Sequence, residues 1–119
     1  MANILIIDDS KMSRRMLRTI LEGIGHDIAG EAANGEEGVK LYKELKPDAV
    51  TMDITMPEKD GIRCLKEINE FDADANVIMV TAAGQKTKMV EAVQSGANEF
   101  VAKPFEAEQL KTVIEKVVK

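Results

Sequence analysis

Residues 48–57 read DAVTMDITMP, a short apolar run that ends on a carboxylate. Residues 49–52 predict a buried strand, and Asp53 stands at the C-terminal end of that strand. Pro57 marks the loop that follows. A carboxylate at the mouth of a parallel sheet costs free energy unless something uses its charge. This stretch therefore predicts a functional site as well as a strand.

Two other strand-like runs end on charged residues. Residues 4–7 are all aliphatic and are followed by Asp8 and Asp9, while residues 100–102 are followed by Lys103. Parallel strands bring their carboxyl ends to the same edge of a sheet, where open α/β folds bind their ligands. We therefore expect three acids and one lysine to converge on one site: Asp8, Asp9, Asp53 and Lys103.

The whole chain alternates strand with helix five times. Apolar residues recur at helical spacing after each strand-like run. This pattern predicts an α/β fold, in which a parallel sheet carries helices on both faces. Right-handed crossovers favour the strand order 2-1-3-4-5, with the acids at the switch point between strands one and three and the polar second strand at an edge. Strands are predicted at residues 3–7, 26–32, 49–53, 77–81 and 99–103.

Capping residues mark the ends of several helices. The first helix is expected to begin near Ser10 or Ser13. Asn34 is the expected N-cap of the second helix, which Pro47 ends. Asp60 is the expected cap of the third helix.

Composition bounds the class of protein. A chain of 119 residues is long enough for one core, so we expect a single domain over residues 1–119. The net charge of −5 argues against non-specific binding to nucleic acid or to anionic membranes. No apolar run is long enough for a membrane span or a signal peptide. The single cysteine, Cys64, rules out an internal disulfide and fits a reducing cytoplasm.

The predicted acidic cluster limits the chemistry of the site. Clustered carboxylates repel one another, so either one keeps a proton or a cation neutralises them. Hard oxygen ligands suit Mg²⁺, and no histidine or cysteine cluster favours zinc or iron. A carboxylate beside Mg²⁺ can attack phosphorus and form an aspartyl-phosphate, whose oxygens need positive charge and hydrogen-bond donors. Lys103 can supply the charge, and the hydroxyl of Thr81, at the end of the fourth strand, can donate.

These motifs, in this order, resemble the receiver domain of two-component response regulators. The resemblance covers essentially the whole chain and implies a flavodoxin-like (βα)5 three-layer sandwich. Because nothing follows the predicted receiver, the chain is most similar to the stand-alone chemotaxis regulators of that family, which are cytoplasmic signalling proteins. The resemblance rests on Asp8-Asp9, on Asp53 with Met56-Pro57 and Asp60-Gly61, on Thr81-Ala82, and on Lys103-Pro104-Phe105.

The resemblance implies how a phosphoryl group would be handled. Asp53 is the expected phosphoacceptor, and Thr81 and Lys103 are expected to bind the phosphoryl group. A histidine kinase donates that group, while the domain itself catalyses the transfer and later hydrolyses its own phosphoryl group. The family usually has a cis peptide bond between Lys103 and Pro104, which would turn the lysine back toward the site.

The resemblance also implies the ligands of Mg²⁺. Asp9 and Asp53 are expected to ligate the ion directly, the backbone carbonyl of Thr55 adds a third protein ligand, and Asp8 helps through water. Two positions tune dephosphorylation in this family, and small residues, Thr55 and Ala83, occupy them here. We therefore expect water to reach the phosphoryl group and the phosphorylated state not to be unusually long-lived.

A conformational switch and its output surface follow from the same resemblance. Phosphorylation is expected to draw Thr81 inward, and Phe100 of the fifth strand rotates into the space left behind. Many chemotaxis members carry tyrosine at that position, and Phe100 lacks the hydroxyl. The expected partners besides the kinase are a flagellar motor switch protein or another target, and a phosphatase. The output surface is expected on the fourth helix, fifth strand and fifth helix, near Lys88, Glu91, Gln94, Glu99, Phe105 and Gln109.

Other interpretations of these residues stay open on the sequence alone. A Mg²⁺-dependent phosphatase with an aspartyl nucleophile generally has a second acid two residues later, where this chain has Thr55. A flavin-binding protein of the same architecture needs a phosphate loop after the first strand, where this chain has Asp8-Asp9. A receiver that works by protein contacts alone would not need the intact acid set. Outside chemotaxis, a stand-alone receiver can serve a phosphorelay or a sporulation pathway.

Overall fold

The computed structural model describes residues 2–54, 61–81, 86–103 and 106–118. These residues form strands and helices in strict alternation, as the sequence pattern predicts. The elements are β1 (Asn3–Ile7), α1 (Lys11–Gly23), β2 (Asp27–Ala32), α2 (Gly35–Leu45), β3 (Ala49–Asp53), α3 (Gly61–Phe71), β4 (Val77–Thr81), α4 (Lys86–Gln94), β5 (Glu99–Ala102) and α5 (Ala107–Val117).

All five strands join one parallel sheet in the order β2-β1-β3-β4-β5. The predicted strand order is therefore confirmed. β3 and β4 are buried along their whole length, whereas most residues of β2 are partly exposed. The predominantly apolar strands β1, β3 and β4 lie in the centre, where helices cover both faces of the sheet, and the more polar β2 lies at an edge.

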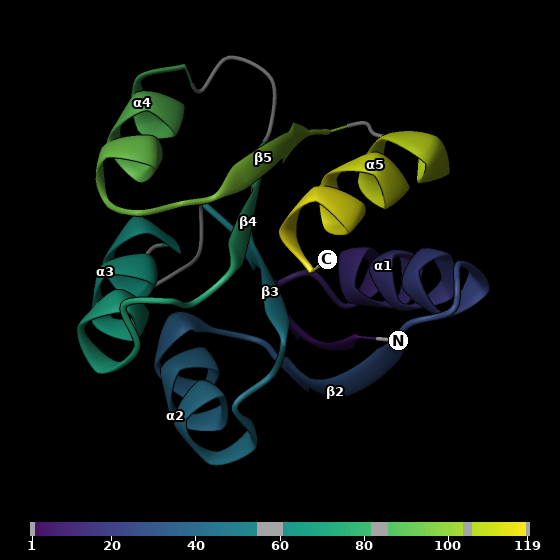
Figure 1. The fold of residues 1–119 in the computed structure, drawn as a ribbon, viewed down its shortest axis with the longest axis horizontal. Helices are drawn as coiled ribbons and strands as arrows, with labels where there is room; N and C mark the ends of the chain where they lie inside the picture. Colours follow the sequence, from purple (N-terminus) through teal and green to yellow (C-terminus); the bar gives the residue numbers. More distant parts are fainter. Residues whose placement is uncertain (1, 55–60, 82–85, 104–105, 119) are drawn as a thin grey trace.

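Helices cover both faces of the sheet (Figure 1). α1 and α5 lie on one face, and α2, α3 and α4 lie on the other. β1 shows how a central strand serves both layers: Ile4 and Ile6 belong to the core beneath α1 and α5, while Leu5 and Ile7 belong to the core beneath α2 and α3. The alternation of side chains along a strand divides one aliphatic run between two cores.

The helix ends follow the capping signals. Ser10 caps α1, since its hydroxyl accepts a hydrogen bond from the backbone N–H of Ser13 at 3.2 Å, and Asn34 caps α2 in the same way. α2 ends at Leu45, where Lys46 takes a left-handed conformation with φ 47° just before the proline that was expected to end it. The predicted starts of α1 and α2 are thus confirmed.

Two predicted strands are one residue shorter in the structure. β2 begins at Asp27, because the backbone N–H of His26 donates instead to the carbonyl of Leu21 at the end of α1. β5 ends one residue before Lys103, although the backbone N–H of Lys103 still donates to the carbonyl of Thr81 at 2.7 Å. Backbone pairing between β4 and β5 therefore continues up to the lysine.

Within the described ranges, no helix combines the length and the apolar character that a bilayer span requires. Several predictions concern residues outside those ranges. They are the Asp60 cap, the Thr55 carbonyl ligand, the small residues Ala82 and Ala83, the cis Lys103–Pro104 peptide bond and the place of Phe105 on the output surface.

Candidate functional site

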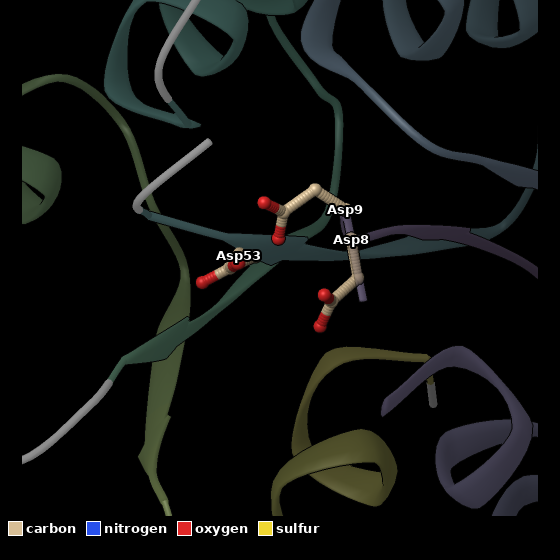
Figure 2. Close-up of side chains that lie close together, drawn as sticks. All are labelled: Asp8, Asp9 and Asp53. Atoms are coloured by element: carbon tan, nitrogen blue, oxygen red, sulfur yellow. The ribbon is translucent and has the colours of Figure 1, made fainter. Parts of the chain in front are cut away.

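Three carboxylates meet at the carboxyl ends of β1 and β3 (Figure 2). Asp8 and Asp9 directly follow β1, and Asp53 is the last residue of β3. Each offers an oxygen, and these oxygens all lie within 4.8 Å of one another. The three acids converge because β1 and β3 are hydrogen-bonded neighbours in the sheet.

The cluster is closed on one side and open on the other. Asp8 is 1% exposed and Asp53 is 8% exposed, whereas Asp9 is exposed to solvent. Asp9 is therefore the member of the cluster that meets solvent, while Asp8 is enclosed by protein. Negative charge held in a partly buried cluster is costly unless a cation balances it.

All but one of the polar atoms of Asp8 take part in hydrogen bonds with described residues. Its Oδ1 accepts a hydrogen bond from the backbone N–H of Ser10 at 2.8 Å, and its own N–H donates to the carbonyl of Ala32 at 3.0 Å. Its Oδ2 is buried and has no hydrogen-bond partner among the described residues. The nearest positive charge to this oxygen is the Lys103 ammonium, an ion pair at 3.5 Å, and an oxygen that accepts no hydrogen bond in this position can also serve a metal cation.

Lys103 reaches the cluster from the end of β5. Its Nζ lies 3.5 Å from Asp8 Oδ2 and 3.4 Å from the hydroxyl oxygen of Ser13. The structure therefore brings the predicted lysine to the predicted acids. Ser13 was expected only as a possible start of α1, and its contact with Lys103 was missed. The only signal in the sequence is that the first turn of α1 follows directly after Asp9.

Thr81 lies at the end of β4, between the strands that carry Asp53 and Lys103. It is fully buried, and it pairs in register with Ala102 of β5. Its carbonyl accepts the hydrogen bond from the backbone N–H of Lys103. The predicted acceptor and hydroxyl thus lie at the ends of β3 and β4, and the predicted lysine directly follows the adjacent β5.

The start of α3 packs against the backbone of the β3 end. The N–H of Gly61 donates to the carbonyl of Ile54 at 2.7 Å. A Cβ atom at position 61 would lie 2.7 Å from Ile54 Cα and closer still to the carbonyl oxygen of Asp53. Only glycine allows this approach, so the Gly61 seen in the sequence motif is required by packing around the proposed acceptor.

Phe100 does not join the acidic cluster. It is 40% exposed on β5 and lines an open apolar groove of about 450 Å³ together with Met89, Val90, Val93 and Gln94 of α4. The side chain therefore lies on the predicted output surface with much of its ring toward solvent. The other described residues of that surface are exposed or half-buried, namely Lys88, Glu91, Glu99 and Gln109.

Two arginines of α1 converge on Glu31 of β2, a feature absent from the sequence-based site. Arg14 Nε lies 3.3 Å from one carboxylate oxygen of Glu31, and Arg18 Nε lies 2.6 Å from the other. The hydrogen bond that Arg18 donates to Glu31 raises the pKa of Arg18 above its ordinary value. Arginines four residues apart lie on one helix face, but the sequence did not reveal which acid they face.

The described acids fit a hard divalent cation. Asp8, Asp9 and Asp53 supply oxygen ligands within one ion's reach, and the buried Asp8 oxygen lacks a hydrogen bond in the described structure. Oxygen donors of this kind suit Mg²⁺. Among the described residues, no other group of three or more histidines, cysteines or acids has its ligand atoms close enough together to hold a metal ion.

Comparison with known proteins gives a match over nearly the whole chain. Residues 4–115 match the family described as the response regulator receiver domain. The chain is 47% identical to the chemotaxis protein CheY of Thermotoga maritima, over 98% of this chain and 97% of that protein. It is 48% identical to CheY of Bacillus subtilis, over 97% of this chain and 96% of that protein.

Other similar proteins extend this picture. The Bacillus subtilis protein CcdB is 48% identical over 99% of this chain and 98% of its own length. Among solved structures, the CheX–CheY–BeF₃–Mg²⁺ complex from Borrelia burgdorferi contains a chain of 40% identity that superposes with a TM-score of 0.92. That alignment covers 97% of this chain and 87% of the other.

Proposed function

The chain belongs to the response regulator receiver family, and from that premise we propose that it is a phosphorylation-controlled switch in chemotaxis. It is a response regulator, a signalling protein, which sets aside the phosphatase and flavin-binding interpretations. One observation carries the proposal: three carboxylates cluster at the strand ends, beside Lys103. The chemotaxis assignment is supported by full-length similarity to several CheY proteins.

Asp53 is the proposed phosphoacceptor. One of its carboxylate oxygens attacks the phosphorus of a phosphohistidine on a histidine kinase. The new O–P bond forms as the N–P bond breaks, and the imidazole nitrogen keeps the electron pair. Lys103 and the hydroxyl of Thr81 would bind the phosphoryl oxygens as charge builds on them. Attack by water would later release inorganic phosphate and return the carboxylate.

Mg²⁺ is the proposed cofactor of this transfer. Asp9, Asp53 and the backbone carbonyl of Thr55 would hold the ion, with Asp8 acting through water. When bound, Mg²⁺ supplies positive charge that offsets the charge on the transferred phosphoryl group. The small side chains at Thr55 and Ala83 would leave room for the water that ends the signal.

The output of the switch is proposed to lie on the surface formed by α4, β5 and α5. Movement of Thr81 toward the phosphoryl group would let Phe100 turn inward from its exposed position. That turn would reshape the apolar groove between α4 and β5 that Phe100 now lines. A relative has been captured with CheX, and we expect this chain to bind a flagellar motor switch protein or another target, and a phosphatase, in the cytoplasm.

The phosphoryl transfer can be tested by intact-mass measurement. The purified protein is incubated with phosphoramidate or acetyl phosphate, with and without Mg²⁺. The expected result is a mass increment of one phosphoryl group that requires Mg²⁺ and disappears in Asp53→Asn, because the amide is not a nucleophile for phosphorus. Asp48→Asn, which changes an exposed acid at the opposite end of β3, is the matched control and should keep the increment.

Binding of beryllofluoride separates two explanations if no increment appears. A protein that binds beryllofluoride with Mg²⁺ but shows no increment hydrolyses its phosphoryl group too fast to detect. A protein that shows no increment and also fails to bind beryllofluoride with Mg²⁺ is a receiver that works by protein contacts alone, and the proposed chemistry is then wrong.

A receiver outside chemotaxis is the second candidate. Not every similar protein is named CheY, since the Bacillus subtilis protein CcdB is as identical to this chain as the Bacillus subtilis CheY is. Capture of partners on the beryllofluoride-bound protein distinguishes the two pathways. A flagellar switch component among the captured proteins supports chemotaxis, while a phosphotransfer protein in its place supports a phosphorelay.

A further inference from the structure

Arg14 makes a contact that the proposed function does not use. It lies in the first turn of α1, its side chain is 17% exposed, and its Nη1 donates to the backbone carbonyl oxygen of Asp8 at 2.7 Å. Its Nε donates to Glu31 of β2 at 3.3 Å. One guanidinium therefore joins the end of β1 to the neighbouring edge strand.

Glu31 fixes the position of the Arg14 guanidinium by accepting a hydrogen bond from it. One of its carboxylate oxygens accepts from Arg14, and the other accepts from Arg18 at 2.6 Å. The Glu31 side chain is 29% exposed, so solvent only partly screens these contacts. The planar fork of Arg14 can satisfy two acceptors at once in a fixed geometry, which a lysine cannot do.

The position of the Asp8 carbonyl affects the orientation of Asp9. Its oxygen belongs to the planar peptide unit that joins Asp8 to Asp9, so a fixed oxygen also fixes the direction in which Asp9 leaves the strand. The hydrogen bond from the Ser10 N–H to Asp8 Oδ1 also spans Asp9 and constrains its backbone from the other side. The Asp9 side chain itself is exposed, and no hydrogen bond or ion pair to it occurs among the described residues.

We propose that Arg14 is a positioning residue for Asp9, fixing the Asp8–Asp9 peptide so that the Asp9 carboxylate faces Asp53. The inference rests on the proposed function, in which these carboxylates hold Mg²⁺. Glu31 acts one step further out, since it holds the guanidinium that holds the peptide. Residues that orient ligands in this way contribute to metal affinity without touching the ion.

Charge and positioning predict opposite effects when Arg14 is removed. Taking a positive charge away from the neighbourhood of a cation site should, by Coulomb's law alone, strengthen Mg²⁺ binding. Losing the hydrogen bond to the Asp8 carbonyl should weaken it, because Asp9 must then be ordered when the ion binds. The sign of the change in affinity therefore distinguishes the two effects.

The experiment compares Arg14→Gln with Arg18→Gln in the full chain. Both variants remove one positive charge from the same face of α1 and one contact with Glu31, but only Arg14 reaches the Asp8 carbonyl. Calorimetric titration of the metal-free proteins with Mg²⁺ should show affinity about ten-fold weaker in Arg14→Gln, the usual scale for an orienting residue. Arg18→Gln should bind Mg²⁺ as the wild type does, or slightly more tightly.

A measurement without metal tests the same point. Backbone ¹⁵N relaxation of the metal-free protein should show a more mobile Asp9 amide in Arg14→Gln but not in Arg18→Gln. Arg14→Lys keeps the charge and can donate to the Asp8 carbonyl, so it should recover part of the lost affinity. Thermal unfolding shows that each variant is folded; Arg14→Gln and Arg18→Gln each lose one contact with Glu31 and one further contact, to the Asp8 carbonyl and to Glu22 respectively.

Equal Mg²⁺ affinity in the two glutamine variants, or tighter binding in Arg14→Gln, would overturn the positioning role. If the wild type takes up Mg²⁺ and a phosphoryl group while Arg14→Gln keeps full affinity, only this inference fails. A wild type that binds no Mg²⁺ overturns the inference together with the proposed function on which it rests.

Discussion

At the scale of single residues, Thr51 lowers the stability of the fold because its hydroxyl is buried without a hydrogen bond to the described part of the chain. It is fully buried in the middle of β3, between Ile6 and Ile78 on the neighbouring strands. Its hydroxyl has no hydrogen-bond partner among the described residues. A buried hydroxyl in apolar surroundings loses its hydration without compensation, so Thr51→Val, which has nearly the same shape, should raise the free energy of unfolding by about 1 kcal/mol.

Urea denaturation followed by circular dichroism measures this gain as a higher midpoint with an unchanged slope. Thr19→Val is the matched control, because Thr19 is exposed on α1 and its hydroxyl is already hydrated. The control should leave the midpoint nearly unchanged. A midpoint for Thr51→Val at or below the wild-type value would mean that the hydroxyl has a partner and that its burial is compensated.

At the scale of elements, a hydrogen bond from Tyr42 ties α2 to the end of α3. The hydroxyl of Tyr42, on α2, donates to Asp72 Oδ2 at 2.8 Å just after α3, and the Tyr42 ring meets Phe71 edge to face. Burial, followed by the bond to Asp72 and its charge, raises the pKa of Tyr42 well above its ordinary value of 10.0. The neutral phenol is thus favoured in the folded protein and ionises more readily in the unfolded chain.

The sign of the pH dependence follows from that raised pKa. The Tyr42 contribution to stability is fully present below the unfolded-state pKa near 10.0 and is lost as pH rises from there toward the folded-state pKa. Tyr42→Phe should therefore be less stable than the wild type by about 1 kcal/mol at pH 7. The difference should shrink above pH 10, which parallel urea titrations at several pH values would reveal. A difference that stays constant to high pH would contradict the role given to the phenol.

At the scale of the whole molecule, the sequence predicts the sheet better than the contacts around the site. Strand order could be predicted because aliphatic runs and right-handed crossovers are local or topological constraints. The same constraints brought Asp8, Asp9 and Asp53 together at one edge. The contacts of Ser13 and Arg14 could not be predicted, since each joins side chains from distant elements whose orientation depends on packing. The exposed position of Phe100 likewise depends on its rotamer, which no sequence pattern specifies.

The acidic cluster that is proposed to bind Mg²⁺ is also expected to lower the stability of the metal-free protein. Without metal, bringing Asp53 up to Asp8 and Asp9 is expected to destabilise the folded state, because the unfolded chain keeps Asp53 away from the two adjacent acids. Asp9→Asn removes one of these charges and should raise the thermal midpoint of the metal-free protein by a few degrees. Asp27→Asn, which changes an exposed acid at the start of β2, is the matched control and should leave the midpoint nearly unchanged.

Mg²⁺ should reverse this order of stability. An ion that binds only the folded state stabilises it by about 2.7 kcal/mol at one hundred times its dissociation constant. Wild type should therefore gain more from Mg²⁺ than Asp9→Asn, which lacks a proposed ligand, and become the more stable of the two. Calorimetric melting in EDTA and in a Mg²⁺ series measures both midpoints. A midpoint for Asp9→Asn below the wild-type value in EDTA would show that Asp9 is not repelled by its neighbours, and an equal rise of both midpoints with Mg²⁺ would show that the ion binds elsewhere.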